Sequence, residues 1–445
     1  MANFNKDCNI KFPSQPPVQF SKPVFDPYEK PKELDKLSLW GSHDPAIYHD
    51  PVSGNYYTYC TGAVARRSRD MITWENIGKV VENPPKESID WVGDNGIWAP
   101  DIIKVEDEYR LYCSNSTWGV RQSCIFLAVA DNAEGPFIPR GCVIKTSEDM
   151  KVNAIDANLI IEEETGEQYM TYGSFWGGIN IIKLDKKTGL ATEEGIGQCI
   201  ACRPQWTDCA IEGPYIKYNP DTKYYYLFVS YGSLKSDYNI RVGRSKSIIG
   251  PYYDHNDREM TDLDDVKNEV GYMILCGYHF DNGQGYMGPG HNSVLRDFDN
   301  EWYLVCHIRE HDFKIPQIAT MHIYKMFWTS DGWPVINLER YAGEKTQSIE
   351  RDYIVGEYER IKLVPSIPQG VINSVPMTLH EDGKFECCSI NGHWEYINDT
   401  TISTYYGNIV ETYKVTPAWD WQLNEPTIAI AGKDQYGVAV CGKKI

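Results

Sequence analysis

One motif occurs five times along the chain: a polar residue opens a short apolar run, a turn follows, and a second run rich in aromatic residues returns. The five copies open at Asp44, Asp101, Asp156, Glu212 and His291. The steps between them are 57, 55, 56 and 79 residues, and we interpret the polar segment 254–270 as an insertion in the last step. A repeat of this length built from short strands is typical of a propeller blade, and the 3.6-residue apolar rhythm of helical repeats is missing. The sequence therefore predicts an all-β fold, a five-bladed β-propeller with four strands per blade.

The motif stops near residue 343, where shorter alternating strands such as 361–364 and 383–388 take its place. About a hundred residues of this kind, separated by turn signals, indicate a small β-barrel or sandwich. Residues 1–35 are rich in proline and charge and predict an irregular arm on the propeller surface. We therefore expect an N-terminal arm (1–35), a five-bladed catalytic propeller (36–342) and a C-terminal barrel-like domain (343–445). Within the propeller, the fourth blade is expected to end near His255.

Composition restricts the partners. The formal net charge of −19 argues against nucleic acid and anionic membranes and is compatible with a neutral substrate. No segment approaches the roughly 20 apolar residues of a membrane span. Residues 1–12 lack a basic start followed by an apolar run, so we expect a cytoplasmic protein, the alternative being secretion after removal of an export signal.

The thirteen cysteines lie mostly inside strand-like runs, which predicts free, buried thiols and favours a reducing compartment. Cys199 and Cys202 have the spacing of a metal-binding or redox pair. No second pair and no suitably spaced histidine follows them, so we do not expect a zinc site there.

Propeller geometry should bring the five opening residues together. The innermost strand of each blade runs along the central channel, so equivalent positions in five blades point at one place. Four carboxylates and one imidazole at that place would repel one another and raise one another's pKa. Such clusters occur where a reaction needs acids in different protonation states. One aspartate of this kind would usually be a strand cap, but three acids at related positions favour catalysis.

The segments around these residues resemble glycoside hydrolase family 43. They are His43-Asp44-Pro45, Trp98-Ala99-Pro100-Asp101, Ala154-Ile155-Asp156, Ile211-Glu212-Gly213-Pro214 and Gly290-His291-Asn292. Within that family the chain looks like an endo-1,5-α-L-arabinanase with a C-terminal β-barrel domain. The resemblance covers roughly residues 40–337.

The resemblance implies an inverting glycoside hydrolase. In it Asp44 is the general base that activates the attacking water, and Glu212 is the general acid that protonates the leaving oxygen. The carboxyl groups of these two residues should stand about 6.5–9.5 Å apart, which leaves room for the water. Asp156 is expected to orient Glu212 and keep its pKa high, whereas Asp101 is expected to be structural.

The same resemblance places His291 near a calcium ion in the axial channel, mostly coordinated by water. Calcium prefers oxygen ligands, so a channel histidine bonded within the protein is the alternative. Trp98 and the segment Ser174-Phe175-Trp176 are expected at the channel mouth, where aromatic faces can stack on furanose rings. Blade packing is the alternative for each tryptophan. Asn153 and Ser174 are expected to hydrogen-bond sugar hydroxyls.

Three functions remain open at this point. The first is endo-cleavage of α-1,5-linked L-arabinan or arabino-oligosaccharides, and the second is exo-acting α-L-arabinofuranosidase or β-xylosidase activity. Loop conformation separates these two, because it decides whether the cleft is open at both ends. The third is a non-catalytic carbohydrate-binding propeller. The intact acid set argues against the third, because a binding module does not need a carboxylate triad.

Overall fold

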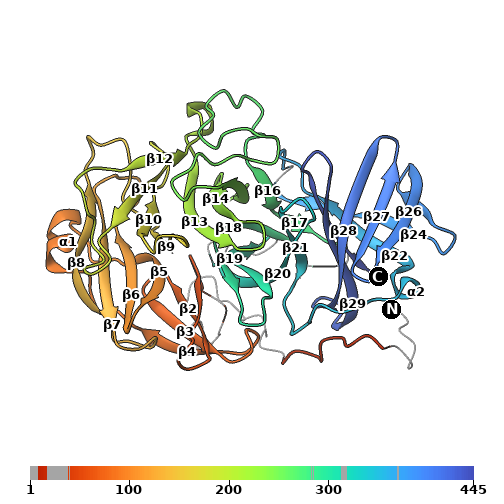
Figure 1. The fold of residues 1–445 in the computed structure, drawn as a ribbon, viewed down its shortest axis with the longest axis horizontal. Helices are drawn as coiled ribbons and strands as arrows, with labels where there is room; N and C mark the ends of the chain where they lie inside the picture. The colour runs from red at the N-terminus through yellow and green to blue at the C-terminus, as the bar shows by residue number, and fades with distance from the viewer. Residues whose placement is uncertain are drawn as a thin grey trace, which may run out of the picture.

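The computed structural model describes residues 9–17, 39, 41–281, 283, 285–311, 318–367 and 370–445. These residues form a five-bladed propeller followed by a closed eight-stranded barrel, which lie side by side along the long axis of the molecule (Figure 1). The predicted all-β fold is confirmed, and the second domain is a barrel. Among the described residues, no helix reaches the length and apolarity that a membrane span requires.

Each blade contains four antiparallel strands in chain order. Blade one consists of β1 (Ala46–His49), β2 (Tyr56–Cys60), β3 (Val64–Ser68) and β4 (Trp74–Lys79). Helix α1 (Lys86–Val92) precedes blade two, which consists of β5 (Trp98–Val105), β6 (Glu108–Asn115), β7 (Ser123–Ala130) and β8 (Ile138–Thr146). Blade three consists of β9 (Asn158–Ile161), β10 (Gln168–Tyr172), β11 (Ile179–Leu184) and β12 (Gln198–Ala201).

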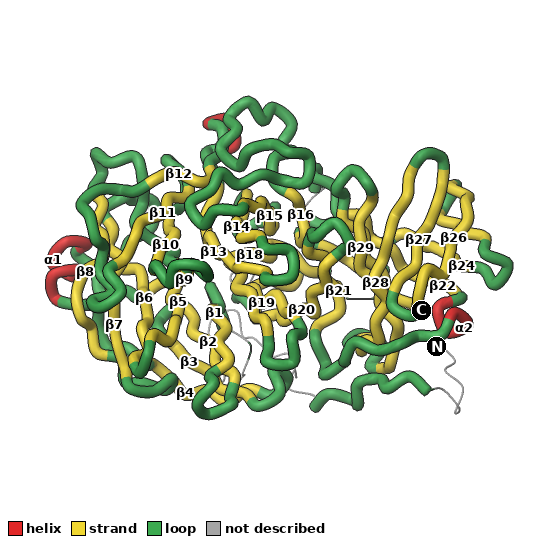
Figure 2. The backbone as a smooth tube through the Cα atoms, viewed as in Figure 1, coloured by secondary structure: helices red, strands yellow, loops and turns green. Residues whose placement is uncertain are grey.

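After the short 3-10 helix η2 (Gln205–Thr207), blade four consists of β13 (Ile211–Asn219), β14 (Tyr224–Tyr231), β15 (Asn239–Ser245) and β16 (Tyr272–Leu275). Blade five consists of β18 (Tyr286–Arg296), β19 (Trp302–Glu310), β20 (Thr320–Trp328) and β21 (Pro334–Arg340), with β17 (Tyr278–His279) added beside β18. The first strands β1, β5, β9, β13 and β18 contact one another in a ring, which the last contact, between β18 and β1, closes (Figure 2).

The segment 254–270 lies inside blade four rather than after it. It separates β15 from β16, so the predicted end of this blade near His255 is wrong. The buried guanidinium of Arg241 holds the segment by donating to the carbonyls of Asn268, Val270 and Gly271. This fourth strand was not predicted from the sequence because a polar loop separates it from the rest of its blade.

Strand register shows which residues are equivalent in the five blades. One matching position pairs with the second strand as Ala46↔Tyr59, Asp101↔Tyr112, Asn158↔Thr171, Tyr215↔Phe228 and Ser293↔Val305. We call the residue two positions earlier the head of each blade, and the heads are Asp44, Ala99, Asp156, Gly213 and His291. Each head has a positive φ, from 37° at Ala99 to 63° at Asp156. The predicted equivalence of Asp101 and Glu212 with Asp44 is therefore wrong, because Asp101 lies two residues after its head and Glu212 one residue before.

Each head is held by a side chain of the preceding blade. The amides of Ala99, Asp156, His291 and Asp44 donate to Thr61 Oγ1, Ser114 Oγ, Ser230 Oγ and His307 Nδ1, at 3.0, 2.9, 2.8 and 3.2 Å. Gly173 stands at the matching position of blade three and has no side chain to offer. The fifth head, Gly213, donates instead to Asp156 Oδ2 at 3.1 Å. A left-handed backbone in non-glycine residues costs free energy and persists only where such contacts enforce it.

A second set of contacts joins the blades two residues after the heads. The amide of Leu159 donates to Asp101 Oδ2 at 2.8 Å, and the amide of Ile216 donates to Asn158 Oδ1 at 2.8 Å. Ser293 Oγ accepts from the amide of Ile47 at 3.0 Å and donates to the carbonyl of Pro45 at 2.7 Å, which ties blade five to blade one. Because this serine is only 1% exposed, the contact closes the propeller without help from solvent.

The barrel begins after helix α2 (Arg351–Ile354). Its strands are β22 (Gly356–Lys362), β24 (Val375–Leu379), β25 (Lys384–Cys387), β26 (Ile390–Asn398), β27 (Thr401–Tyr406), β28 (Ile409–Asp420), β29 (Glu425–Asp434) and β30 (Ala439–Lys444). Strands β22 and β30 pair and close it. The predicted division between residues 342 and 343 falls in the segment that connects β21 to this domain.

Barrel and propeller share one hydrophobic core. Ile336 and Leu338 of blade five pack in the same buried cluster as Ile361 and Cys441 of the barrel. The buried ammonium of Lys443 pairs with Glu339 of blade five at 2.9 Å. The barrel also supplies β23 (Ile372–Asn373), which pairs in parallel with β17 and so extends the blade-five sheet. The two domains are therefore one packed body.

Most of the predicted N-terminal arm (1–35) lies outside the described residues. The described part, 9–17, lies against the barrel side of the molecule: Ile10 and Phe12 pack on the barrel core, and the amide of Lys11 donates to Gln347 Oε1 at 2.8 Å. The expectation that the arm follows the propeller surface is wrong for this part.

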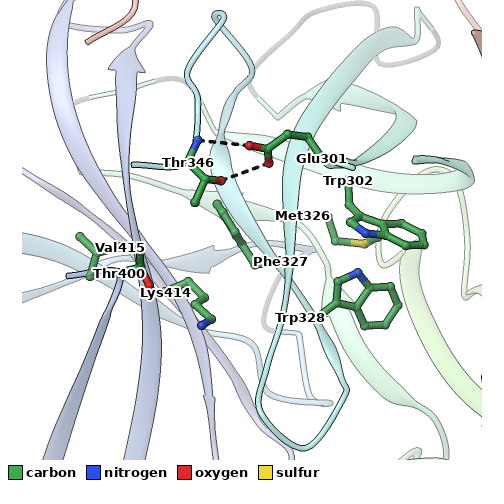
Figure 3. Close-up of a pocket in the computed structure, with 9 residues that line it drawn as sticks. All are labelled: Glu301, Trp302, Met326, Phe327, Trp328, Thr346, Thr400, Lys414 and Val415. Atoms are coloured by element: carbon green, nitrogen blue, oxygen red, sulfur yellow. Dashed lines mark hydrogen bonds between the residues drawn. The ribbon is translucent and has the colours of Figure 1, made fainter. Parts of the chain in front are cut away.

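A cavity of about 190 Å³ lies where blade five meets the barrel (Figure 3). Trp302, Phe327 and Trp328 line it from the propeller, and Thr400 and Lys414 from the barrel. It shares no residue with the heads of the blades, so it is a feature of the domain junction and separate from the chemistry of the channel.

We predict that Ser293→Ala weakens the closure of the propeller. The substitution leaves the buried amide of Ile47 and the carbonyl of Pro45 without partners, and each unpaired buried group costs about 1–3 kcal/mol. The thermal midpoint and the guanidinium midpoint of unfolding should both fall. Ser389→Ala, at an exposed serine of a barrel turn, is the control and should change stability by less than about 0.5 kcal/mol. Equal stability of the two variants would contradict the role of Ser293.

Candidate active site

Three carboxylates meet at one end of the inner strands. His291 Nδ1 lies 3.1 Å from Asp44 Oδ1 and 3.9 Å from Asp156 Oδ2. The same Asp156 oxygen accepts the amide hydrogen of Gly213, the residue that follows Glu212. A continuous chain of contacts therefore runs from Asp44 through His291 and Asp156 to the backbone that carries Glu212. The structure brings these side chains together as predicted, although Asp101 and Glu212 had been assigned to the wrong position of the repeat.

Glu212 stands one residue before its head because the ring is crowded there. A Cβ atom added at Gly213 would lie 3.1 Å from both Cα and Cγ of His291. A side chain at this head would therefore press on His291, and the φ of 56° also suits glycine. The carboxylate comes from the adjacent position, next to the crowded point and still within reach of the other two acids.

Asp44 is surrounded by donors. Its Oδ2 accepts from Thr61 Oγ1 at 2.6 Å and contacts His43 Nδ1 at 2.8 Å, while Oδ1 faces His291. Burial alone would raise the pKa of Asp44, but the neighbouring charges of His291 and His43 hold the pKa well below its usual range. Asp44 is thus an ionised carboxylate near neutral pH.

His307 completes the wall behind Asp44. Burial lowers the pKa of His307 well below its ordinary value, so the ring is neutral. Its Nδ1 accepts the amide hydrogen of Asp44, and the ring stacks on His43 with 4.4 Å between centroids. In this tautomer Nδ1 is occupied by the protein backbone, and the ring serves to hold Asp44 in its left-handed conformation.

Asp156 has the opposite electrostatic environment. Burial, the charge on Glu212 and the charge on Asp44 all raise the pKa of Asp156 well above its usual range. The amide of Gly213, which donates to Oδ2, favours its ionised form. The expected effect of Asp156 on Glu212 stays a prediction, and the raised pKa belongs to Asp156 itself, which is only 5% exposed.

Two hydroxyl groups hold Glu212. Ser174 Oγ donates to Oε2 and Tyr238 OH donates to Oε1, each at 2.9 Å. Ser174 was predicted to contact sugar hydroxyls, and its contact with Glu212 makes it part of the acid's support. Tyr238 was missed by the sequence analysis.

The remaining predicted contact residues lie around this cluster. Asn153 is buried, and its Oδ1 accepts from Ser123 Oγ at 2.7 Å. Trp98 opens β5 and is half-buried. Phe175 and Trp176 follow Ser174 with positive φ values, and Trp176 is 39% exposed beside the guanidinium of Arg121. Their contacts with a sugar stay predictions.

Asp101 lies outside the cluster, so the prediction that all five opening residues meet at one place is wrong for Asp101. Its Oδ2 accepts from Asn158 Nδ2 and from the amide of Leu159, at 3.0 and 2.8 Å. Burial raises its pKa to about 6. Its role is to join blade two to blade three.

The twelve described cysteines are free thiols. Neither Cys199 nor Cys202 belongs to a group of potential metal ligands in the described part of the chain. The one such group there is His43, Asp44 and His307, and it does not include His291.

Two family models match the chain. "Glycosyl hydrolases family 43" matches residues 27–334, and "C-terminal lipocalin-like domain" matches residues 338–442. The first match ends at the first residue of β21, the last strand of blade five, and includes every carboxylate of the cluster. The second spans the barrel.

Similar proteins match over nearly the whole chain. An extracellular endo-α-(1→5)-L-arabinanase of Thermotoga petrophila is 32% identical, with 90% of this chain and 94% of the relative covered. Extracellular endo-α-(1→5)-L-arabinanase 2 of Bacillus subtilis is 30% identical, with 90% and 92% covered. The crystal structure of endo-1,5-α-L-arabinanase from Thermotoga petrophila superposes with a TM-score of 0.83 at 29% identity, covering 92% of this chain and 99% of that one.

We predict that Asp156→Asn stabilises the protein at neutral pH. A carboxyl whose pKa is raised by folding keeps its proton to a higher pH in the folded state than in the unfolded state. The free energy of unfolding therefore falls as the pH rises from the pKa of the unfolded state to the pKa of the folded state. Asparagine removes the charge, tolerates a positive φ and still offers an oxygen to the amide of Gly213. The gain at pH 7 should be at least about 1 kcal/mol, and it should vanish near pH 3. Melting curves at both pH values check this, and an unchanged or lower midpoint at pH 7 would contradict it.

Proposed function

Because the chain belongs to glycosyl hydrolase family 43, we propose that it hydrolyses α-1,5-linked L-arabinan and arabino-oligosaccharides within the chain, with inversion at the anomeric carbon. The observation that carries this proposal is the convergence of Asp44, Asp156 and Glu212 in two opposite electrostatic environments. The endo mode is supported by the endo-arabinanases that match about nine-tenths of this chain.

Asp44 acts as the general base. Its pKa is held low, so it is ionised and can take a proton from a water molecule as that water attacks the anomeric carbon. The contacts from Thr61 and His43 fix its orientation. An inverting reaction requires the water to stand between this carboxylate and the sugar, on the face opposite the leaving group.

Glu212 acts as the general acid. It gives its proton to the glycosidic oxygen as the bond to the anomeric carbon breaks, so that the leaving sugar departs as an alcohol. Ser174 and Tyr238 hold its two oxygens. The raised pKa of Asp156 favours a proton on this pair of carboxyls, because two adjacent carboxyls cannot both ionise cheaply.

Asp156 has a second task in this proposal. By accepting the amide hydrogen of Gly213 it fixes the backbone on which Glu212 sits. It therefore orients the acid through the main chain.

We also propose that a calcium ion, mostly water-coordinated, binds beside His291. The ring fits such a role: when Nδ1 donates to Asp44, Nε2 presents a lone pair, and a carboxylate behind a ligating histidine is the usual support. The ion would order water in the channel and place positive charge near the carboxylates. Oxygen donors from the solvent would complete its shell, because calcium prefers oxygen.

The names of the relatives also bear on location. Both relatives named above are extracellular enzymes by name, which supports the secreted alternative for this chain. The substrate would then be the polymer outside the cell.

We expect the protein to convert linear arabinan into a ladder of oligosaccharides, with the β-anomer formed first. Chromatography of early products and time-resolved NMR of the anomeric signal measure both. Release of arabinose alone would favour an exo enzyme, and retention of configuration would contradict the assigned roles of the two acids.

Glu212→Gln should lower kcat on arabinan by about 10²–10⁴-fold, the usual contribution of a general acid. The kcat on an aryl arabinofuranoside with a good leaving group should fall far less, because the aryl group departs with little protonation. Glu164→Gln, at an exposed turn residue, is the control and should leave both rates unchanged. Full activity of Glu212→Gln would support a function other than hydrolysis at this site.

For the metal, we expect added calcium to raise the thermal midpoint of the chelator-treated protein. At a calcium concentration of 100 times Kd, binding should increase the free energy of unfolding by about 2.7 kcal/mol. His291→Ala should abolish the increase, and His393→Ala, at an exposed barrel histidine, should retain it. Calorimetric titration gives the stoichiometry. No response in the parent protein would contradict the site.

A further inference from the structure

Tyr238 is the one tyrosine whose hydroxyl contacts a carboxylate of the cluster among the described residues. It lies in the turn between β14 and β15, is 1% exposed, and donates to Glu212 Oε1 at 2.9 Å. Its ring is parallel to that of His307, with 5.8 Å between centroids. The tyrosine therefore touches both the acid and the wall behind Asp44.

The neighbouring strand and turn restrict the position of the Tyr238 ring. A Cβ atom at Gly290 would lie 1.9 Å from Tyr238 Cε1, so glycine at that point of β18 makes room for the ring. Ser233 provides the other constraint, because its carbonyl accepts the amide hydrogens of both Ser236 and Tyr238 at 3.0 Å. The turn and the strand together aim the hydroxyl at Glu212.

The barrel supports this turn from outside. Gly370, in the segment between β22 and β24, has φ +82°, and a Cβ atom there would lie 2.5 Å from the carbonyl oxygen of Ser236. The amide of Ile372 donates to the carbonyl of Gly277 at 2.9 Å, where β23 joins the blade-five sheet. The C-terminal domain thus packs directly against the turn that carries Tyr238.

The hydroxyl suits a carboxyl that changes charge during a reaction. Tyr238 is buried beside Glu212 and Asp156, which raises its pKa well above the ordinary value, so it stays a donor. A donor to a carboxylate stabilises the ionised form, which Glu212 adopts as it gives up its proton. The same bond fixes the direction of the second oxygen, on which proton transfer depends.

We propose that Tyr238 is a positioning residue for the acid Glu212, held in place by the contact between the barrel and its turn. This inference rests on the proposed function and adds a residue that acts through the acid, without contact to the substrate. It predicts that the hydroxyl matters for proton donation to the leaving group and not for substrate binding.

The test is Tyr238→Phe, which keeps the ring and removes the hydroxyl. We expect kcat on linear arabinan to fall about 10- to 100-fold with KM unchanged, as for the loss of a hydrogen bond to a charged group. The rate on an aryl arabinofuranoside with a good leaving group should change less than about threefold, since that bond breaks without strong acid assistance. The matched control is Tyr231→Phe, at a buried tyrosine whose hydroxyl has no partner, and it should leave both rates unchanged.

A second variant tests the support from the barrel. Gly370→Ala should push against Ser236 and lower kcat on arabinan in the same selective way. Combined with Tyr238→Phe it should add little, because both changes act on one contact. Melting curves for each variant separate this effect from loss of the fold.

Full kcat of Tyr238→Phe on arabinan would overturn the proposal. Equal loss on both substrates would overturn it as well, because that pattern indicates a general disturbance of the channel. Failure of the proposed function looks different: the parent protein would then hydrolyse neither substrate, and Glu212→Gln would change nothing.

Discussion

The hydrogen bonds that pass from each blade to the head of the next are the constraint on which the site depends. They hold the five heads in a left-handed conformation, four of them at residues other than glycine. Such a backbone is costly in isolation and is found mainly where the surroundings enforce it, often at functional sites. In blade three the usual hydroxyl is replaced by Gly173, and Asp156 takes over the contact to the next head. Asp156 is therefore both a structural contact between two blades and a carboxylate of the site.

This arrangement separates the acids electrostatically. Asp44 faces donors and neighbouring histidines and remains ionised, whereas Asp156 faces two other carboxyls in a buried place and tends to keep its proton. The fold tolerates the unfavourable charge near Asp156 because packing and hydrogen bonds elsewhere stabilise the whole molecule. The barrel contributes to that stability, since its core is continuous with that of blades four and five. It also reaches the turn beside Glu212, so the second domain is part of the support of the site.

Much of this was readable from the sequence because it rests on local pattern. The five-fold repeat gave the number of blades, and the change of pattern near residue 343 gave the second β domain. The acids Asp44, Asp156 and Glu212 were identifiable because each opens an apolar run of the same kind. Asp101 opens such a run too, but it joins blade two to blade three and lies outside the cluster in which its place in the repeat had predicted it. Two finer predictions failed. The fourth strand of blade four lies beyond a 17-residue polar insertion, and offsets of two residues for Asp101 and one residue for Glu212 put them at the wrong position of the repeat.

The sequence by itself thus determined the fold class and identified Asp44, Asp156 and Glu212 as acids that converge, because strand repeats and acidic residues are properties of the chain read in order. Only the tertiary structure decided how those acids are held. Thr61 and His307 occupy matching positions of blades one and five, but their residue types differ, and Tyr238 lies in a turn of blade four. Nothing local therefore marks these residues as partners of Asp44 and Glu212. The protonation of Asp156 likewise depends on burial and on charges distant in sequence. Such properties arise only when the ring closes, because closure brings the side chains of separate blades within hydrogen-bonding distance.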